Sequence, residues 1–253
     1  PNFAKIIEKK HFESRYSSFQ AELCFKLYFN ILDNKYKKFI TRFSEKEEIV
    51  KGNILNTPQG TLKYSICIGN LSPYVEMIID NNLQYKVDPN TGVISIPELI
   101  PKDIKSETCN KFKQLKNHIL KSKGKRIVIS SQFAEQGAYL LSMYLNIENI
   151  QHLYLNNKLS IKKRIEILNL FNNDKFNIII IDKTSSEGVS LLRVSEIHLL
   201  EPISNLSLKD QIVARGVRYK SHEGIKDPEV NVYTHVSVMS LNSTQINDFK
   251  TAV

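Results

Sequence analysis

Residues 178–192 read I-I-I-I-D-K-T-S-S-E-G-V-S-L-L and carry the strongest structural signal of the chain. The isoleucines predict a strand over 177–181 that is buried on both faces, as strands of parallel sheets are. A turn rich in hydroxyl groups, with one glycine, follows Asp182. Such a turn lets a backbone approach a phosphate and offers it N–H and O–H donors, but an ordinary capping loop explains the turn equally well.

On both sides of this stretch, candidate strands alternate with candidate helices. Strands are predicted over 126–130, 151–155, 194–200 and 230–238, and helices over 107–122, 134–145, 161–171 and 208–219. Ser160 is the candidate N-cap of the helix over 161–171. Strands separated by helices of about a dozen residues predict βαβ units. We therefore expect an α/β fold over residues 113–253, in which a parallel sheet carries helices on both faces and functional residues lie at the carboxyl ends of the strands.

The first 112 residues have a less regular pattern. Residues 19–32 have the apolar spacing of an amphipathic helix with lysines on its flanks. Residues 85–96 predict a hairpin, because Pro89 presets a turn and Gly92 can take the positive φ that closes it. Two prolines then interrupt the chain, so we expect residues 1–112 to form a smaller α+β accessory region of unknown role.

The composition is that of a globular protein with a basic surface. Of the 253 residues, 42% are hydrophobic and 24% are charged, which argues against disorder along the whole chain. Lysine and arginine outnumber aspartate and glutamate by 35 to 26, a formal net charge of +9. This excess is typical of proteins that bind a polyanion such as nucleic acid, but a lysine-rich proteome would also produce it, so both explanations stay open.

The cysteines and apolar runs bear on cellular location. Cys24, Cys67 and Cys109 are isolated in the sequence, which fits neither a zinc site nor a disulfide framework. We expect reduced thiols in a cytoplasmic compartment and no membrane segment, because the apolar runs are too short to span a bilayer. The chain begins at Pro1 without a methionine, and we expect it to be a fragment of a longer protein.

A second candidate site lies in the segment Q-I-V-A-R-G-V-R. On a helix, Gln211, Arg215 and Arg218 are spaced i, i+4 and i+7 and share one face. Two guanidinium groups and an amide on one stripe suit the charge that develops on a transferred γ-phosphate. The small neighbours Ala214 and Gly216 would leave room for a triphosphate or another domain. Exposed arginines on an amphipathic surface helix would explain the same pattern without a ligand.

The order of three segments resembles motifs IV, V and VI of superfamily 2 helicases. The segments are R-I-V-I-S-S-Q-F at 126–133, S-S-E-G-V-S-L-L at 185–192 and Q-I-V-A-R-G-V-R at 211–218. The third is similar to the superfamily pattern Q-x-x-G-R-x-x-R, with Ala214 in place of the usual glycine. The resemblance is that of a C-terminal, second RecA-like lobe and covers roughly residues 123–239.

Within the superfamily, the chain most resembles the nucleoside triphosphatase and early-transcription-factor helicases of poxviruses and other large cytoplasmic DNA viruses. The stretch E-G-V-S-L-L-R-V-S-E-I-H-L-L-E-P at 187–202 carries this likeness. A Ser-His pair soon after the arginines, here ending at His222, is a further similarity. We interpret His222 as a structural histidine.

The resemblance implies a role for each matching residue. Arg215 and Arg218 would reach ATP bound on a first lobe, and Gln211 would couple the nucleotide to lobe closure. Glu187 and Gly188 would face the nucleotide cleft. Six further residues of the matching segments would contact the nucleic-acid backbone: Ser130, Ser131, Gln132, Thr184, Ser185 and Ser186.

The sequence contains no phosphate loop of the form G-x-x-x-x-G-K-[ST] and no segment similar to D-E-x-H. We therefore expect ATP and Mg²⁺ to bind mainly on a first lobe outside this chain, which would be inactive by itself.

In the intact protein the chain would act in an ATP-dependent helicase or translocase on DNA or RNA. The viral resemblance implies a role in viral transcription or genome metabolism, in a viral factory or a virion, with the viral RNA polymerase as a further candidate partner. One alternative is a non-catalytic nucleic-acid-binding or scaffold module with a degenerate helicase fold. Another is an unrelated doubly wound enzyme, which would need a glycine-rich phosphate site that the sequence lacks.

Overall fold

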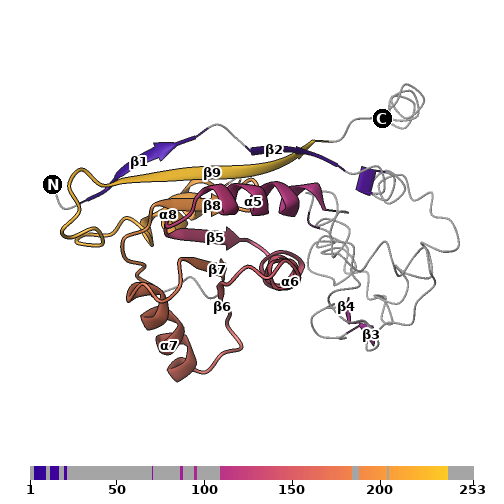
Figure 1. Ribbon diagram of the computed structural model, residues 1–253, viewed down its shortest axis with the longest axis horizontal. Helices are drawn as coiled ribbons and strands as arrows, with labels where there is room; N and C mark the ends of the chain where they lie inside the picture. Colours follow the sequence, from indigo (N-terminus) through magenta and orange to yellow (C-terminus); the bar gives the residue numbers. More distant parts are fainter. Residues whose placement is uncertain are drawn as a thin grey trace, which may run out of the picture.

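The computed structural model describes residues 3–9, 12–16, 20–21, 70, 86–87, 94–95, 109–183, 188–203 and 205–238. Over these residues the chain forms a seven-stranded sheet flanked by helices and a separate two-stranded sheet (Figure 1). None of the described helices is long and apolar enough to cross a membrane.

The large sheet is parallel throughout. Its strands are β1 (Lys5–Glu8), β2 (Phe12–Arg15), β5 (Ile127–Ser131), β6 (Leu153–Leu155), β7 (Ile178–Asp182), β8 (Glu196–Leu199) and β9 (Glu229–Val238). They are arranged in the order β1-β9-β8-β5-β7-β6, with β2 also paired to β9. All of these pairs are parallel, which confirms the α/β fold predicted from the alternating pattern.

The helices connect these strands. They are α5 (Asn110–Lys121), the π-helix η4 (Ala134–Tyr139), α6 (Leu140–Ile147), α7 (Ile161–Asn172) and α8 (Leu206–Ala214). The predicted N-cap of α7 is confirmed, since the Ser160 hydroxyl accepts a hydrogen bond from the Lys163 amide at 3.3 Å. The α-helix predicted over 134–145 begins instead as a π-helix, so only its second half is α-helical.

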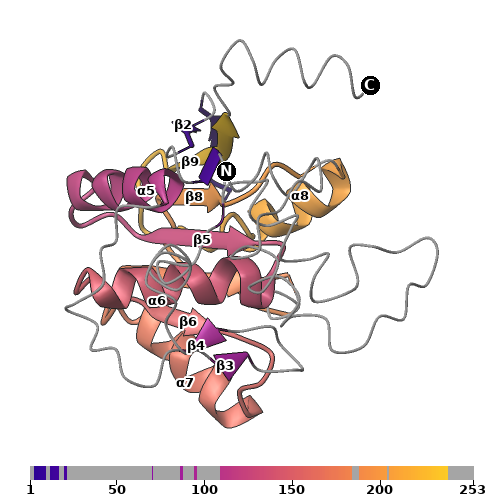
Figure 2. The same ribbon diagram turned by 90° about the vertical axis from the view of Figure 1, so that its right-hand side faces the viewer.

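Helices cover both faces of the sheet, as predicted. Successive residues of β7 point to opposite faces, and Ile179 and Ile181 pack in one core cluster with Phe171 of α7 and Ile212 of α8. On the other side, α5 packs against α6, where the rings of Phe112 and Tyr144 have their centroids 5.6 Å apart. Figure 2 shows α5 and α8 on opposite faces of the sheet.

Two strands from the N-terminal region join this sheet, which the sequence did not predict. β1 pairs with the first part of β9, and β2 pairs with its second part, so both lie along one edge of β9 (Figure 1). Ser14 and Val236 are 222 positions apart, yet the serine hydroxyl donates to the valine carbonyl. Local periodicity carries no information about a partner so distant in sequence. The division of the chain at residue 112 stays a prediction.

The hairpin predicted over 85–96 is confirmed. β3 (Lys86–Val87) pairs antiparallel with β4 (Ile94–Ser95), and its turn lies outside the described residues. Of the helix predicted over 19–32, only residues 20 and 21 are described, and they are helical. Cys109 is buried and forms no disulfide bond among the described residues, whereas Cys24 and Cys67 lie outside them.

Candidate functional site

Arg215 caps the C-terminal end of α8. Its carbonyl accepts a hydrogen bond from the Leu191 amide at 3.1 Å, which holds it beside the loop between β7 and β8. The Arg215 side chain is half-buried, and its Nε atom is buried with no hydrogen-bond partner among the described residues. The residue is therefore positioned by its backbone, and its Nε has no acceptor in the part of the chain that the structure describes.

Arg218 lies beyond the helix and contacts the same loop. Its Nη1 donates a hydrogen bond to the Ser190 hydroxyl at 2.7 Å. The prediction of one helix over 208–219 is wrong, because α8 ends at Ala214 and Arg218 belongs to the following turn. Arg215 and Arg218 therefore do not share a helix face, although the turn brings both to neighbouring residues of one loop. Gln211 is exposed on the last turn of α8.

Gly216 has a different role from the predicted one. A Cβ at this position would lie 3.1 Å from Ile197 Cδ1 and 3.3 Å from Val194 Cβ. The glycine therefore lets the turn pack closely on the lobe's own core and leaves no room for a ligand or another domain. A glycine is also a poor helix former, which helps to explain why α8 stops just before it.

The loop after β7 is described only from Gly188 onward. Thr184, Ser185, Ser186 and Glu187 lie outside the described residues. Gly188 is exposed with a φ of 71°, and a Cβ there would meet no atom within 4 Å. Its backbone conformation, and not lack of space, is what favours glycine at this position.

The polar end of β5 differs from the expected nucleic-acid surface. Ser130 and Ser131 are 2% and 0% exposed. The Ser131 hydroxyl donates to Glu201 Oε1 at 2.7 Å and accepts from the Phe133 amide at 3.1 Å. Neither serine side chain is available at the surface, because both residues belong to β5, which is buried along its whole length through Ser131. Gln132 is partly exposed, and its Nε2 donates to the Pro202 carbonyl at 3.0 Å.

Glu201 is a buried acid that the sequence interpretation did not single out. Besides Ser131, its carboxylate accepts hydrogen bonds from the Gln132 amide at 2.9 Å and from Asn70 Nδ2 at 2.8 Å. Burial raises its pKa, while the charge of Lys111 and these hydrogen bonds act in the opposite direction. The one sequence feature that could have pointed to Glu201 is the place of this acidic residue directly after the strand predicted over 194–200.

Lys111 of α5 completes this network. Its Nζ donates to Asn70 Oδ1 at 3.2 Å and to the Leu200 carbonyl at 2.9 Å. Burial lowers the pKa of Lys111, and the charge of Glu201 opposes that shift. The network joins residue 70 to the carboxyl ends of β5 and β8.

His222 has the geometry of a structural histidine, as predicted. Its Nε2 lies 2.7 Å from the Val194 carbonyl, which can only accept, so Nε2–H is the donor. Its Nδ1 lies 2.9 Å from the Ser221 hydroxyl and accepts from it when the ring is neutral. The pair fastens the turn after α8 to the residues before β8.

Arg126 shows what a structural arginine looks like in this fold. Its Nε donates to the Leu192 carbonyl at 3.0 Å and its Nη2 to the Phe171 carbonyl at 2.6 Å. Its Nη1 pairs with Asp174, and the guanidinium carbon lies 4.1 Å from the centre of the Phe171 ring. All three guanidinium nitrogens of Arg126 have protein partners, whereas the buried Nε of Arg215 has none among the described residues.

A metal ion has no evident place beside Arg215. In the part of the chain that the structure describes, the one group of three side chains that could hold a metal consists of His118, Glu196 and His198. These residues lie between α5 and β8, on the face of the sheet opposite α8.

Comparisons with known proteins agree with this architecture. Residues 110–220 match the family model described as the helicase conserved C-terminal domain. The chain is 33% identical over 114 residues to a protein named as an ATP-dependent RNA helicase of Acanthamoeba polyphaga mimivirus, covering 44% of this chain and 26% of that protein. It is 32% identical over 111 residues to nucleoside triphosphatase I of Choristoneura fumiferana entomopoxvirus, covering 42% of this chain and 17% of that protein.

A third relative is the termination factor NPH-I homolog of African swine fever virus, with 26% identity over 132 residues, 50% of this chain and 19% of that protein. The matches thus span about a quarter or less of these relatives.

Among solved structures, the C-terminal part of the Fun30 ATPase domain has the same fold, with a TM-score of 0.55 and 18% identity over 98% of this chain and 89% of that one. The parallel sheet and the order of the motifs agree with the match of residues 110–220 to the helicase conserved C-terminal domain, and this region is similar to parts of viral helicases and nucleoside triphosphatases.

Proposed function

We propose that this chain supplies the second RecA-like lobe of an ATP-dependent helicase or translocase that acts on nucleic acid. In this proposal ATP and Mg²⁺ bind mainly on a first lobe, and Arg215 and Arg218 reach the triphosphate across the cleft between the lobes. Gln211 and Gly188 lie on the two segments that border these arginines and would sense the nucleotide.

The observation that carries this proposal is the buried Nε of Arg215, which has no hydrogen-bond partner among the described residues. A buried donor without a partner costs about 1–3 kcal/mol, so such a donor calls for an explanation. A phosphate oxygen of ATP would supply the missing acceptor. The saturated side chain of Arg126 shows that this fold can satisfy an arginine completely where the role is structural.

Arg218 suits the same role for a different reason. Its one side-chain contact within the described residues is to the exposed Ser190 hydroxyl, and it forms no ion pair there. The donor of this bond is charged but its acceptor is a neutral hydroxyl, so the bond is weaker than one between a guanidinium group and a charged phosphate oxygen. Arg218 can therefore exchange Ser190 for a phosphate oxygen at little cost.

For the nucleic acid, we propose contacts from Gln132 and from the loop over 184–186. The buried hydroxyls of Ser130 and Ser131 take no part through their side chains. The net charge of +9 supports attraction to a phosphate backbone, which predicts binding that tolerates sequence changes and weakens with salt. The viral relatives support a place in viral transcription or genome metabolism, with action in the viral factory or virion.

The test uses a polypeptide in which this chain is joined to its first lobe. Arg215→Ala should lower kcat for ATP by on the order of 10³-fold, as loss of an arginine finger does. Arg164→Ala, on α7, is the matched control and should leave kcat unchanged. Residues 1–253 alone should show no ATPase activity above background, with or without single-stranded nucleic acid.

Three outcomes would contradict the proposal. The first is an unchanged kcat in Arg215→Ala. The second is loss of cooperative unfolding in that variant, which would make Arg215 a structural residue. The third is nucleic-acid-stimulated ATP hydrolysis by residues 1–253 alone. A two-lobe protein that binds nucleic acid but hydrolyses no ATP would instead support the scaffold alternative.

A further inference from the structure

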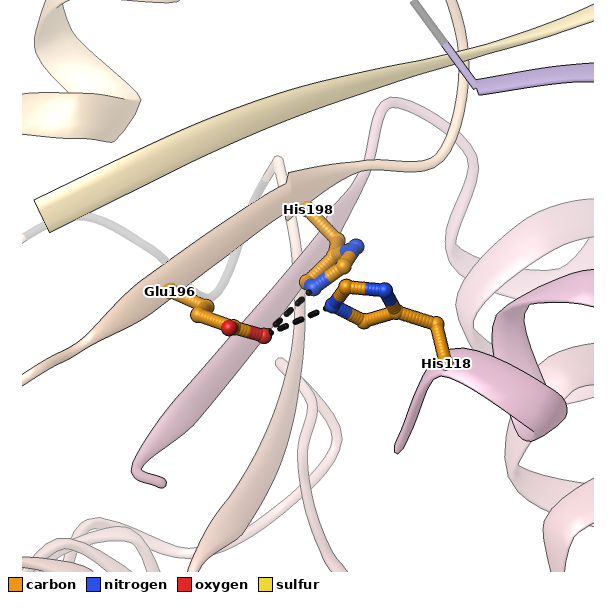
Figure 3. A group of neighbouring side chains, drawn as sticks. All are labelled: His118, Glu196 and His198. Carbon is orange, nitrogen blue, oxygen red and sulfur yellow. Dashed lines mark hydrogen bonds and ion pairs between the residues drawn. The ribbon is translucent and has the colours of Figure 1, made fainter. Parts of the chain in front are cut away.

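A compact group of metal-ligating side chains lies between α5 and β8 (Figure 3). Glu196 and His198 are two residues apart on β8, so both point to the face of the sheet that α5 covers. His118 reaches them from α5. Its Nε2 lies 2.9 Å from Glu196 Oε2, and Nε2 of His198 lies 3.4 Å from the same oxygen. One possible ligand atom from each residue lies within 4.8 Å of the other two.

We propose that His118, Glu196 and His198 form a binding site for a divalent transition-metal ion, with Zn²⁺ as the preferred occupant. Two imidazole nitrogens and one carboxylate oxygen are a ligand set that proteins use for zinc, with a fourth position open to water. Calcium and magnesium prefer sites made only of oxygen ligands, so this combination selects against them.

The distances suit a tetrahedral ion. Ligands at about 2.0–2.1 Å from zinc stand roughly 3.3 Å apart. The separation of 3.4 Å between His198 Nε2 and Glu196 Oε2 already matches this value. The separation of 2.9 Å from His118 Nε2 is that of a hydrogen bond, and a small rotation of the half-exposed end of α5 would widen it.

The His198 ring is oriented by its neighbours before any ion arrives. It is fully buried and stacks on Tyr233, with centroids 4.8 Å apart and planes 16° apart. Its Nδ1 lies 3.0 Å from Nε2 of His235. With Nδ1–H donating to His235, the lone pair of Nε2 is left for the metal, which is how second-shell partners select the ligating nitrogen.

The carboxylate is also held in place, with one oxygen left for the ion. Glu196 is fully buried, and its Oε1 accepts a hydrogen bond from Lys125 at 2.6 Å and a longer one from Ser122 at 3.4 Å. Both contacts are to Oε1, whereas both histidines approach Oε2. The Ser122 hydroxyl also lies 3.2 Å from His118 Nε2, close enough to orient a water in the fourth position.

The group is open to solvent on one side only. Glu196 and His198 have no exposed side-chain surface, whereas His118 is 17% exposed and Lys125 is 48% exposed. An ion would enter past these two residues, at the end of α5. Because it bridges α5 and β8, a bound ion would fasten the helix to the sheet and stabilise the folded state.

The site is independent of the proposed ATP chemistry. α5 lies on one face of the sheet, and α8 with Arg215 lies on the other (Figure 2). Failure of one proposal therefore says nothing about the other.

The test is metal binding by the purified chain without an affinity tag that contains histidine. After removal of metals with a chelator, Zn²⁺ is titrated by calorimetry, and Co²⁺ is titrated by its visible absorption as a probe of tetrahedral geometry. We expect one ion per chain, an intense tetrahedral cobalt spectrum and a higher unfolding temperature in Zn²⁺.

His118→Gln should weaken binding by on the order of a hundredfold or more, since loss of a supporting residue alone costs about 10–100-fold. This variant is preferred because His118 is the least buried ligand. His152→Gln changes a half-buried histidine near β6 and should leave binding intact. Circular dichroism checks that both variants fold.

Absence of one-to-one binding by the unaltered chain would overturn the proposal. It would also be overturned if folded His118→Gln bound Zn²⁺ as tightly as the unaltered chain, because the ion would then lie elsewhere. An octahedral cobalt spectrum would exclude the tetrahedral arrangement.

Discussion

Arg218 donates a hydrogen bond from Nη1 to the Ser190 hydroxyl at 2.7 Å, and this contact joins the turn after α8 to the loop between β7 and β8. A second link runs beside it, from the Leu191 amide to the Arg215 carbonyl at 3.1 Å. The two segments that resemble helicase motifs V and VI are therefore in direct contact. A ligand that binds Arg218 in place of Ser190 would break this contact and so change the surroundings of both segments.

This contact gives a matched pair of substitutions for the proposed two-lobe protein. Ser190→Ala removes the partner of Arg218 but keeps the guanidinium group that would contact the phosphate, so kcat should change less than about tenfold. Arg218→Ala should lower kcat by on the order of 10³-fold. Steady-state ATPase assays compare the two variants. Equal losses would mean that the contact matters as a structural link and that Arg218 does not act on the nucleotide.

Nucleic-acid binding should depend steeply on salt. Each phosphate contact on a single strand contributes a slope of roughly −0.7 to log K against log salt, because binding releases counterions. Gln132→Ala should weaken binding but leave the slope unchanged, since its side chain is neutral. Gln151→Ala changes an exposed glutamine elsewhere and serves as the control. Fluorescence titration of a labelled oligonucleotide measures both quantities, and a flat response would show that the net charge is only compositional.

The buried Lys111–Glu201 network should make stability depend on pH. Lys111 acts on Glu201 through its charge and through Asn70, so Lys111→Met leaves the buried Glu201 without this support and should destabilise the fold by about 1–3 kcal/mol. Burial already raises the pKa of Glu201, and loss of the lysine raises it further in the folded state, while the unfolded chain keeps the ordinary value. The penalty is therefore full above the folded-state pKa and fades as the carboxyl is protonated at lower pH.

Urea unfolding of Lys111→Met and of the unaltered chain at pH 8, 6 and 5 measures this dependence. The stability difference should shrink as the pH falls. Lys121→Met, which changes an exposed lysine of the same helix, should show little effect at any of these values. A difference that stayed constant with pH would mean that lost packing, and not the charge of Glu201, causes the destabilisation.

Gly216 should not tolerate a branched side chain. Its Cβ would stand 3.3 Å from Val194 Cβ, an atom fixed by the backbone, so the larger Gly216→Val change should destabilise the fold by about 1–3 kcal/mol. Ala214→Val, at the exposed neighbouring position, should have a smaller effect. Thermal and urea unfolding distinguish the two. Equal stability of both variants would restore the interpretation that Gly216 leaves space for a ligand.

The features that the sequence determined by itself are local. Four isoleucines predicted the buried strand β7, and Ser160 predicted the start of α7, because side-chain period and capping act over a few residues. The hairpin around Pro89 and Gly92 was predictable for the same reason. Motif order pointed to a helicase lobe because each motif is a short segment with its own pattern.

The end of α8 was not determined locally. The spacing of Gln211, Arg215 and Arg218 fits a helix, but Gly216 packs against β8, and this contact with another element ends the helix early. The spacing of these residues could not determine their arrangement, which depended on packing. Only the folded chain could show that the Nε of Arg215 has no partner among the described residues, while Arg126 has three.

Only the tertiary structure brought the remaining groups together. Alternation along β8 places Glu196 and His198 on one face, but it does not say that His118, 78 positions earlier, covers them. In the same way, nothing local joins Lys111 to Asn70, or β2 to β9. The period of a strand or helix shows which side chains turn inward, whereas the element that meets them is chosen by the packing of the whole chain.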